Sequence, residues 1–202
     1  MKLNDLTKLT KRKKGSDRFI EIDMTRGFAI ILMIFIHLLW DLDYFGVMPL
    51  NNLFYSAMQK IVAPLFFILV GMSLVISKKK MESSFLKDEK SYYIGFILRG
   101  LKIFSLGMIL TTATLIFIPG RPVLFGVLHC IGFSAILSVP FLKYRKYTPL
   151  FALLFIFIGS LVSQYSIETP TIFHLAIGLH QTNVFSYTVD YFPLLPWFGV
   201  CL

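Results

Sequence analysis

Long apolar runs separated by short basic clusters limit what this chain can fold into more than any other feature of its sequence. Five such runs are present, at about residues 24–40, 53–76, 93–118, 123–142 and 149–162. A helix rises about 1.5 Å per residue, so most of these runs come close to crossing the roughly 30 Å hydrocarbon layer of a membrane. The hydrophobic fraction of 56% also exceeds what one buried core needs. The runs therefore predict membrane-spanning segments.

Helices are the regular structure that fits these runs. An exposed strand edge in lipid leaves backbone amides unpaired, at a cost of several kcal/mol each. The runs are also too long and too uniformly apolar for barrel strands. We therefore predict an all-α fold, a polytopic transmembrane helix bundle of about five to six helices over residues 24–202. A basic cytoplasmic segment, residues 1–23, precedes it.

The last part of the chain departs from this regular pattern. Ile172 to Leu179 is a short apolar piece in a polar stretch, and we expect an interfacial or re-entrant helix there on the outer side. A sixth run begins at Asp190, but about a dozen residues are too few to cross a bilayer as a helix. We expect either that the chain is a fragment of a longer protein or that this piece packs against the bundle without crossing.

The placement of positive charge predicts the orientation of the bundle. Lysine and arginine concentrate in the N-terminal segment and in the loops at 78–90 and 143–147, whereas the loops at 42–52 and 164–190 contain neither. Basic loops remain on the cytoplasmic side. We therefore predict a multi-pass protein of the cell membrane whose N-terminus lies in the cytoplasm. In this arrangement the formal net charge of +9 indicates the lipid bilayer as a partner, not nucleic acid.

Sequence motifs of soluble enzymes and of metal sites are absent. The chain contains no GxGxxG, Walker, HExxH, CxxC or GxSxG pattern. Cys130 and Cys201 both lie in apolar runs, which argues against a disulfide framework and against metal binding. We predict no metal. Gly71, Gly107, Gly126 and Gly132 are predicted to be helix packing positions.

Titratable side chains inside apolar runs indicate a candidate site, because hydrocarbon is a costly environment for them. His37 lies thirteen residues after Met24, and His129 lies eight residues after Arg121 on a helix of opposite direction. The two histidines can therefore share a level in the outer half of the membrane. Asp41 lies one helical turn after His37 on the same face, where a carboxylate can orient an imidazole.

A second polar set lies toward the cytoplasm and comprises Arg26, Arg99 and Lys102. These cations could form a pocket for phosphate, whose oxygens match the guanidinium fork. Simpler interpretations stay open: histidines packed against neighbouring helices, Asp41 as a helix cap, and cations that reach the interface. The residues alone fit transfer of a group from a phosphorylated cytoplasmic donor to an outer acceptor, and they fit a transporter nearly as well.

Four stretches of the chain resemble the catalytic-domain family of heparan-alpha-glucosaminide N-acetyltransferase, in its prokaryotic branch. They are residues 21–30 with the following His37, 64–74, 124–132 and 190–199, in the order of the family and over about residues 18–202. The resemblance implies a polytopic acyltransferase that uses cytoplasmic acetyl-CoA to acetylate a sugar on the far side. The Arg-Gly pair followed by a histidine is also similar to the membrane acyltransferase-3 group, which implies that His37 is catalytic.

The chain departs from this family in two respects. The animal heparan enzymes have an asparagine at the position of His37, and their catalytic histidine lies in the first outer loop. That loop, residues 42–52 here, contains no histidine. The animal site and heparan as the substrate therefore do not carry over. Members of the family also usually continue through further helices, which agrees with a fragment.

We therefore predict an acyl-CoA-dependent membrane acyltransferase that acts on an outer sugar or glycan acceptor. His37 is the predicted general base, Asp41 orients it, and His129 completes the site or holds the thioester carbonyl. The predicted ligands of the donor phosphates are Arg26, Arg99 and Lys102. An ion-coupled transporter, which the lack of an inverted repeat disfavours, and a non-catalytic membrane subunit are the alternatives. A homo-oligomer stays open.

Overall fold

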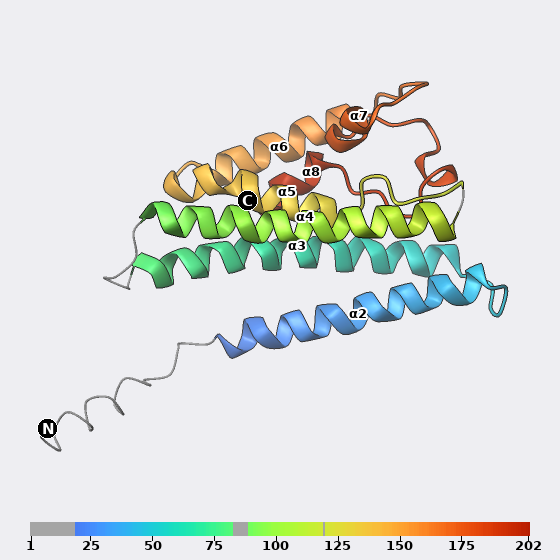
Figure 1. Ribbon diagram of the computed structural model, residues 1–202, viewed down its shortest axis with the longest axis horizontal. Coiled ribbons are helices and arrows are strands. Elements are labelled where there is room, and N and C mark those ends of the chain that lie inside the picture. Colours follow the sequence, from blue (N-terminus) through green and yellow to red (C-terminus); the bar gives the residue numbers. More distant parts are fainter. Residues whose placement is uncertain (1–18, 83–88, 119) are drawn as a thin grey trace, which may run out of the picture. The chain divides into compact units, whose positions relative to one another are not determined.

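The computed structural model describes residues 19–82, 89–118 and 120–202. These residues form seven α-helices and one short 3-10 helix (Figure 1). The described residues contain no β-strand and only two isolated β-bridges. The all-α prediction is confirmed. Most of the predicted cytoplasmic segment, including its basic cluster at 11–18, and the loop residue Lys87 lie outside the described residues. The boundary between residues 23 and 24 stays a prediction.

The helices follow the apolar runs closely. They are α2 (Ile20–Tyr44), α3 (Asn52–Glu82), α4 (Glu89–Phe117), α5 (Val127–Lys143), α6 (Thr148–Val162), α7 (Ile172–Ile177), η1 (Val184–Ser186) and α8 (Leu194–Cys201). Three helices are long and apolar enough to cross a membrane, with spans at Ile20–Tyr44, Leu53–Lys80 and Lys90–Phe117. They indicate a multi-pass membrane protein. Two shorter apolar helices, α5 and α6, have 17 and 15 residues, so the number of crossings and the orientation stay predictions.

The chain divides into two units, Met1–Tyr55 and Ser56–Leu202, and each is described by itself. In the first unit, acidic residues in the first turn of α2 suit the positive end of the helix dipole. A turn after α2 leads to α3. Gly46 in this turn has a φ of 69°, a left-handed backbone conformation that glycine adopts more easily than other residues. The Asp43 carboxylate accepts the Leu50 N–H at 2.8 Å and closes the turn.

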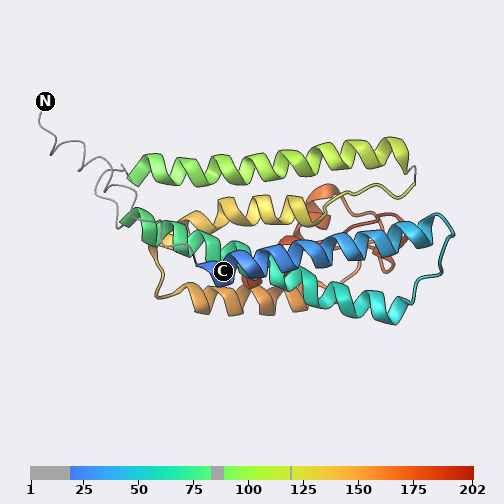
Figure 2. The ribbon, with the colours of Figure 1, turned by 90° about the horizontal axis from the view of Figure 1, so that it is seen from below.

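Glycines make the closest helix contacts of the second unit. A Cβ atom on Gly100 of α4 would lie 2.7 Å from the carbonyl oxygen of Gly132 in α5, and one on Gly132 would lie 2.6 Å from the Phe104 nitrogen. Such distances let the two backbones touch, as small residues do between membrane helices. Figure 2 shows α5 (yellow) running beside α4 (green). The predicted packing roles of Gly71, Gly107 and Gly132 are confirmed, because each lies against atoms of another segment, whereas Gly126 precedes α5 and lies against the Asp190 side chain.

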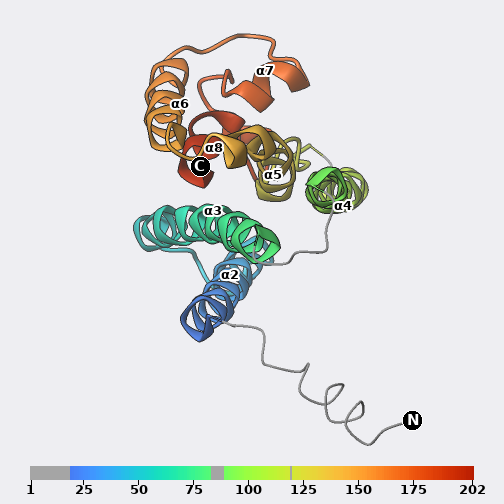
Figure 3. The ribbon, with the colours of Figure 1, turned by 90° about the vertical axis from the view of Figure 1, so that its left-hand side faces the viewer.

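The last helix, α8, packs into the second unit in the same way. Gly199 of α8 lies against the Ala152 carbonyl of α6, and Gly71 of α3 lies against the backbone of Cys201. Figure 3 shows α8 between α5 and α6. The eight residues of α8 thus pack against the bundle, and whether the chain is a fragment of a longer protein stays a prediction. The predicted short helix near Ile172 is α7, which ends where Gly178 takes a φ of 119°.

An aromatic and thiol-bearing core joins these helices. The Phe67 ring of α3 is fully buried and stacks on Trp197 of α8, with the ring centroids 5.1 Å apart. Cys130 and Cys201 lie in the same cluster as free thiols. The core therefore ties α3, α5 and α8 together around the segment that precedes α8.

Two glycines of α4 give a matched test of this packing. Gly100→Ala pushes a methyl group into the backbone of α5 and should lower the free energy of unfolding by about 1–3 kcal/mol. Gly95→Ala meets nothing within 4 Å and should be neutral or stabilising by up to about 1 kcal/mol, since alanine is the better helix former. Thermal unfolding of the purified protein in detergent measures both. Equal melting temperatures for the two variants would contradict the proposed contact.

Candidate functional site

His37 has a defined orientation within α2. Its Nδ1 lies 2.8 Å from the carbonyl oxygen of Met33, one turn earlier. A carbonyl oxygen can only accept, so Nδ1 carries the proton and the Nε2 lone pair is left to act as a base. Among the described residues no hydrogen bond joins the Asp41 side chain to this imidazole. Met33 therefore supplies the orienting contact that the structure gives, and the orienting role of Asp41 stays a prediction.

The three cations predicted to bind donor phosphates lie in different surroundings. Arg26 forms an ion pair with Asp23 at 2.9 Å within the first turns of α2. On α4, Arg99 and Lys102 are exposed and one turn apart. The guanidinium of Arg99 lies 5.7 Å from the centroid of the Phe96 ring, a cation–π contact. The α4 pair thus presents two positive charges on one helix face, and its role in donor binding stays a prediction.

His129 lies at the start of α5 with both ring nitrogens engaged. Its Nδ1 accepts the Gly126 N–H at 3.3 Å. The Thr111 hydroxyl donates to the Val123 carbonyl at 2.7 Å, so its oxygen is free to accept from the imidazole Nε2–H, 3.4 Å away. These partners fix the tautomer with the proton on Nε2. The bond to Gly126 is the half of a capping box in which the third helical residue reaches back to the N-cap amide.

The imidazole of His129 is also closely enclosed. The side chain is 2% exposed. Phe104 meets the ring edge-on with centroids 5.3 Å apart, and Phe125 stacks on it at 5.7 Å. A Cβ atom at Gly107 would lie 3.0 Å from the imidazole, so a larger residue there would have to displace the ring by a few tenths of an ångström. The structure thus packs His129 tightly between α4 and α5, and its catalytic role stays a prediction.

Two stretches far apart in sequence meet beside His129. The buried Thr188 hydroxyl donates to the Pro122 carbonyl at 2.7 Å and accepts from the Leu124 N–H at 3.4 Å. The Asp190 carboxylate accepts the Val127 N–H at 2.9 Å, in the first turn of α5. A negative charge at a helix N-terminus is favourable because unpaired amides and the helix dipole face it. Residues 188–190 therefore cap α5 from a distant part of the chain.

The same contact continues along the backbone. The Phe192 N–H donates to the Phe125 carbonyl at 2.9 Å. The Tyr191 hydroxyl donates to the Leu175 carbonyl of α7 at 2.9 Å, and burial raises the pKa of this hydroxyl, which keeps it a donor. Residues 124–132 and 190–199, two of the four family-like stretches, are thus joined directly to each other.

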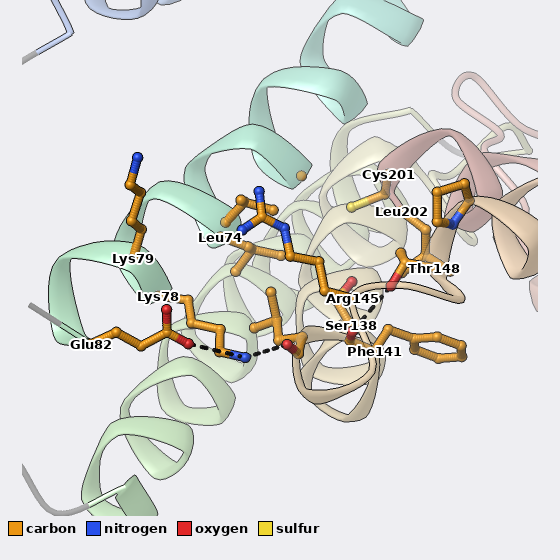
Figure 4. A pocket seen from close by; sticks show the side chains of 14 residues that line it. Leu74, Lys78, Lys79, Glu82, Ser138, Phe141, Arg145, Thr148, Cys201 and Leu202 are labelled. Atoms are coloured by element: carbon orange, nitrogen blue, oxygen red, sulfur yellow. Dashed lines mark hydrogen bonds and ion pairs between the residues drawn. The ribbon is translucent and has the colours of Figure 1, made fainter.

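A charged cavity of about 230 Å³ lies at the opposite end of α5, where α3 ends and α6 begins (Figure 4). The charged residues that line it are Lys78, Lys79, Glu82 and Arg145. The Lys78 ammonium forms an ion pair with Glu82 at 3.4 Å and also donates to the Leu142 carbonyl. The basic loops predicted only the orientation of the helices, and nothing in their spacing indicated that these cations share a cavity.

The described ranges hold no group of three or more His, Cys, Asp or Glu side chains that could bind a metal. The sequence did not predict the polar contacts around His129. Asp190 caps a helix 63 residues earlier, and no local pattern connects an acidic residue to a helix start at that separation. Thr111 lies within an apolar run, and nothing in its local sequence indicates its contact with His129.

His129 offers two variants that separate its packing from its acid–base chemistry. Glutamine at the third helical position can still accept the Gly126 N–H, so His129→Gln should keep the wild-type melting temperature within a few degrees. His129→Ala leaves that amide unpaired beside a cavity and should cost about 2 kcal/mol or more. Thermal unfolding in detergent measures both. Unfolding of His129→Ala at the wild-type temperature would show that the cap does not matter.

Comparison with known proteins identifies the family of the chain. A family model described as "Heparan-alpha-glucosaminide N-acetyltransferase, catalytic" matches residues 18–202. Neither the comparison with curated proteins nor that with solved structures finds a match. The family match covers nearly the whole chain, including the junction of residues 124–132 with residues 190–199. The chain belongs to the heparan-alpha-glucosaminide N-acetyltransferase catalytic-domain family.

Proposed function

We propose that this protein is an acetyl-CoA-dependent membrane acetyltransferase that transfers an acetyl group from the cytoplasm to a sugar or glycan on the outer side. The observation that carries the proposal is the family match over residues 18–202, since the family implies acetyl transfer from acetyl-CoA. Three helices of membrane-spanning length support the location. The basic loops support an N-terminus in the cytoplasm.

The proposed reaction uses His37 as a general base. Its Nε2 removes the proton from the acceptor hydroxyl or amine while that oxygen or nitrogen attacks the thioester carbonyl. The carbon–sulfur bond then breaks, the thiolate of CoA leaves, and the imidazolium returns the proton to that sulfur. The Met33 carbonyl supports this role, because it holds the proton on Nδ1 and leaves Nε2 to accept.

The other predicted residues have supporting roles in this proposal. The Nε2–H of His129 is the group that would hold the thioester carbonyl. Its bond to Thr111 is long at 3.4 Å, and a thioester carbonyl would have to displace that hydroxyl from the closely enclosed ring. The predicted donor cations are Arg26, Arg99 and Lys102. Arg99 and Lys102 support phosphate binding as an exposed pair on one face of α4.

The base is tested by acetyl transfer from labelled acetyl-CoA in purified membranes, with a panel of amino sugars and glycans as acceptors. His37→Gln should lower kcat about 10²–10⁴-fold, because a general base contributes about that much. His174→Gln is the matched control. This histidine bonds to Thr171 at the start of α7 and has no part in the proposed site. Wild-type turnover in a folded His37→Gln variant would reject the assigned base.

Asp41 is tested against its neighbour Asp43 in the same assay. If Asp41 stabilises the protonated imidazole, Asp41→Asn should lower kcat about tenfold or more while the melting temperature changes little. Asp43→Asn instead weakens the turn after α2, since Asp43 accepts the Leu50 N–H, and should leave kcat unchanged. Equal kcat values for both variants would contradict the role of Asp41, and the Met33 carbonyl would then be the group that orients the imidazole.

A further inference from the structure

The cavity at the junction of α3, α5 and α6 has an unbalanced charge. Three cations and one carboxylate line it. The ammonium of Lys78 is already paired with Glu82 and with the Leu142 carbonyl. Within the described part of the chain, the side chains of Lys79 and Arg145 form neither a hydrogen bond nor an ion pair. Both are exposed residues at the rim of the cavity, and no acidic side chain of the described residues pairs with either one.

Apolar side chains form the rest of the wall. They are Leu74, Val75, Phe141, Leu142 and Leu202. Figure 4 shows the Arg145 guanidinium reaching toward Leu74 of α3, across the cavity from its own loop. A volume of about 230 Å³ is smaller than the roughly 300–1,000 Å³ of sites that enclose a whole organic ligand. The cavity thus suits the charged group of an amphiphilic ligand and the first atoms of its apolar part.

We propose that this cavity is a binding site for the phosphate ester of an amphiphilic ligand, with Arg145 and Lys79 as its phosphate contacts. A guanidinium fork matches two phosphate oxygens, and an ammonium adds a point charge. Two sources supply this chemistry, the phosphates of the CoA donor and the headgroup of an anionic phospholipid. The CoA source rests on the proposed function, and it would place the donor phosphates on residues other than Arg99 and Lys102.

The two sources are distinguished with the purified full chain in phosphatidylcholine nanodiscs. In the first arm, calorimetry measures binding of CoA, dephospho-CoA and pantetheine. In the second arm, the probe is phosphatidylglycerol added to the nanodiscs, and the melting temperature is the readout, because a ligand of the folded state raises it. Arg145→Gln is compared with Lys146→Gln, which removes one charge from the next residue but does not line the cavity. Arg145→Lys tests the need for the fork.

If CoA is the ligand, Arg145→Gln should weaken its binding at least about tenfold, with Arg145→Lys intermediate and Lys146→Gln close to wild type. If a phospholipid is the ligand, Arg145→Gln should abolish the stabilisation by phosphatidylglycerol and Lys146→Gln should preserve it. Either result supports the proposal. Equal behaviour of Arg145→Gln and Lys146→Gln in both arms would overturn it.

Acetyl transfer by the same variants separates this inference from the proposed function. Wild-type transfer with an unchanged KM for acetyl-CoA in Arg145→Gln, together with an unchanged response to phosphatidylglycerol, overturns the phosphate site and leaves the acetyltransferase intact. No transfer by the wild-type protein, together with a lipid response that depends on Arg145, overturns the acetyltransferase and supports the phosphate site.

Discussion

The second unit depends on backbones that approach within contact distance. In hydrocarbon, apolar side chains gain little by leaving lipid for another helix, so close packing and polar contacts have to hold the helices together. Gly100 and Gly132 bring α4 against α5 closely enough that neither position has room for a Cβ atom. The same requirement at Gly199 and Gly71 fixes α8 between its neighbours. The positions of the polar side chains follow from these contacts.

The polar contacts at the start of α5 show what this packing achieves. Asp190 and His129 satisfy amides of the first turn, which would be expensive to leave unpaired away from water. Each partner is itself held, His129 by aromatic rings and Asp190 by the paired backbone of residues 188–192. This joins two segments that the family match includes. In this structure the two segments thus stabilise each other.

The helices and the family were predictable from the sequence, whereas the partners of individual residues were not. Apolar runs predicted the positions of α2 to α6, with ends that differ by up to six residues, because hydrocarbon demands length and continuity. Gly71, Gly107 and Gly132 were identified as packing positions, whereas Gly100 and Gly199, which make equally close contacts, were not. The cap from Asp190 and the shared cavity of Lys78 and Arg145 depend on which helices become neighbours, and no local pattern encodes that. His37 was identified as a candidate base, but its contact with Met33 follows from the side-chain rotamer.

The helix α5 separates two polar regions of the second unit. His129 lies near its N-terminal end, and Leu142, whose carbonyl accepts from the Lys78 ammonium, lies near its C-terminal end. The two residues are thirteen positions apart, or about 20 Å along the helix axis. A molecule that touched both ends at once would have to be long and slender. A compact acyl phosphate could not bridge that length.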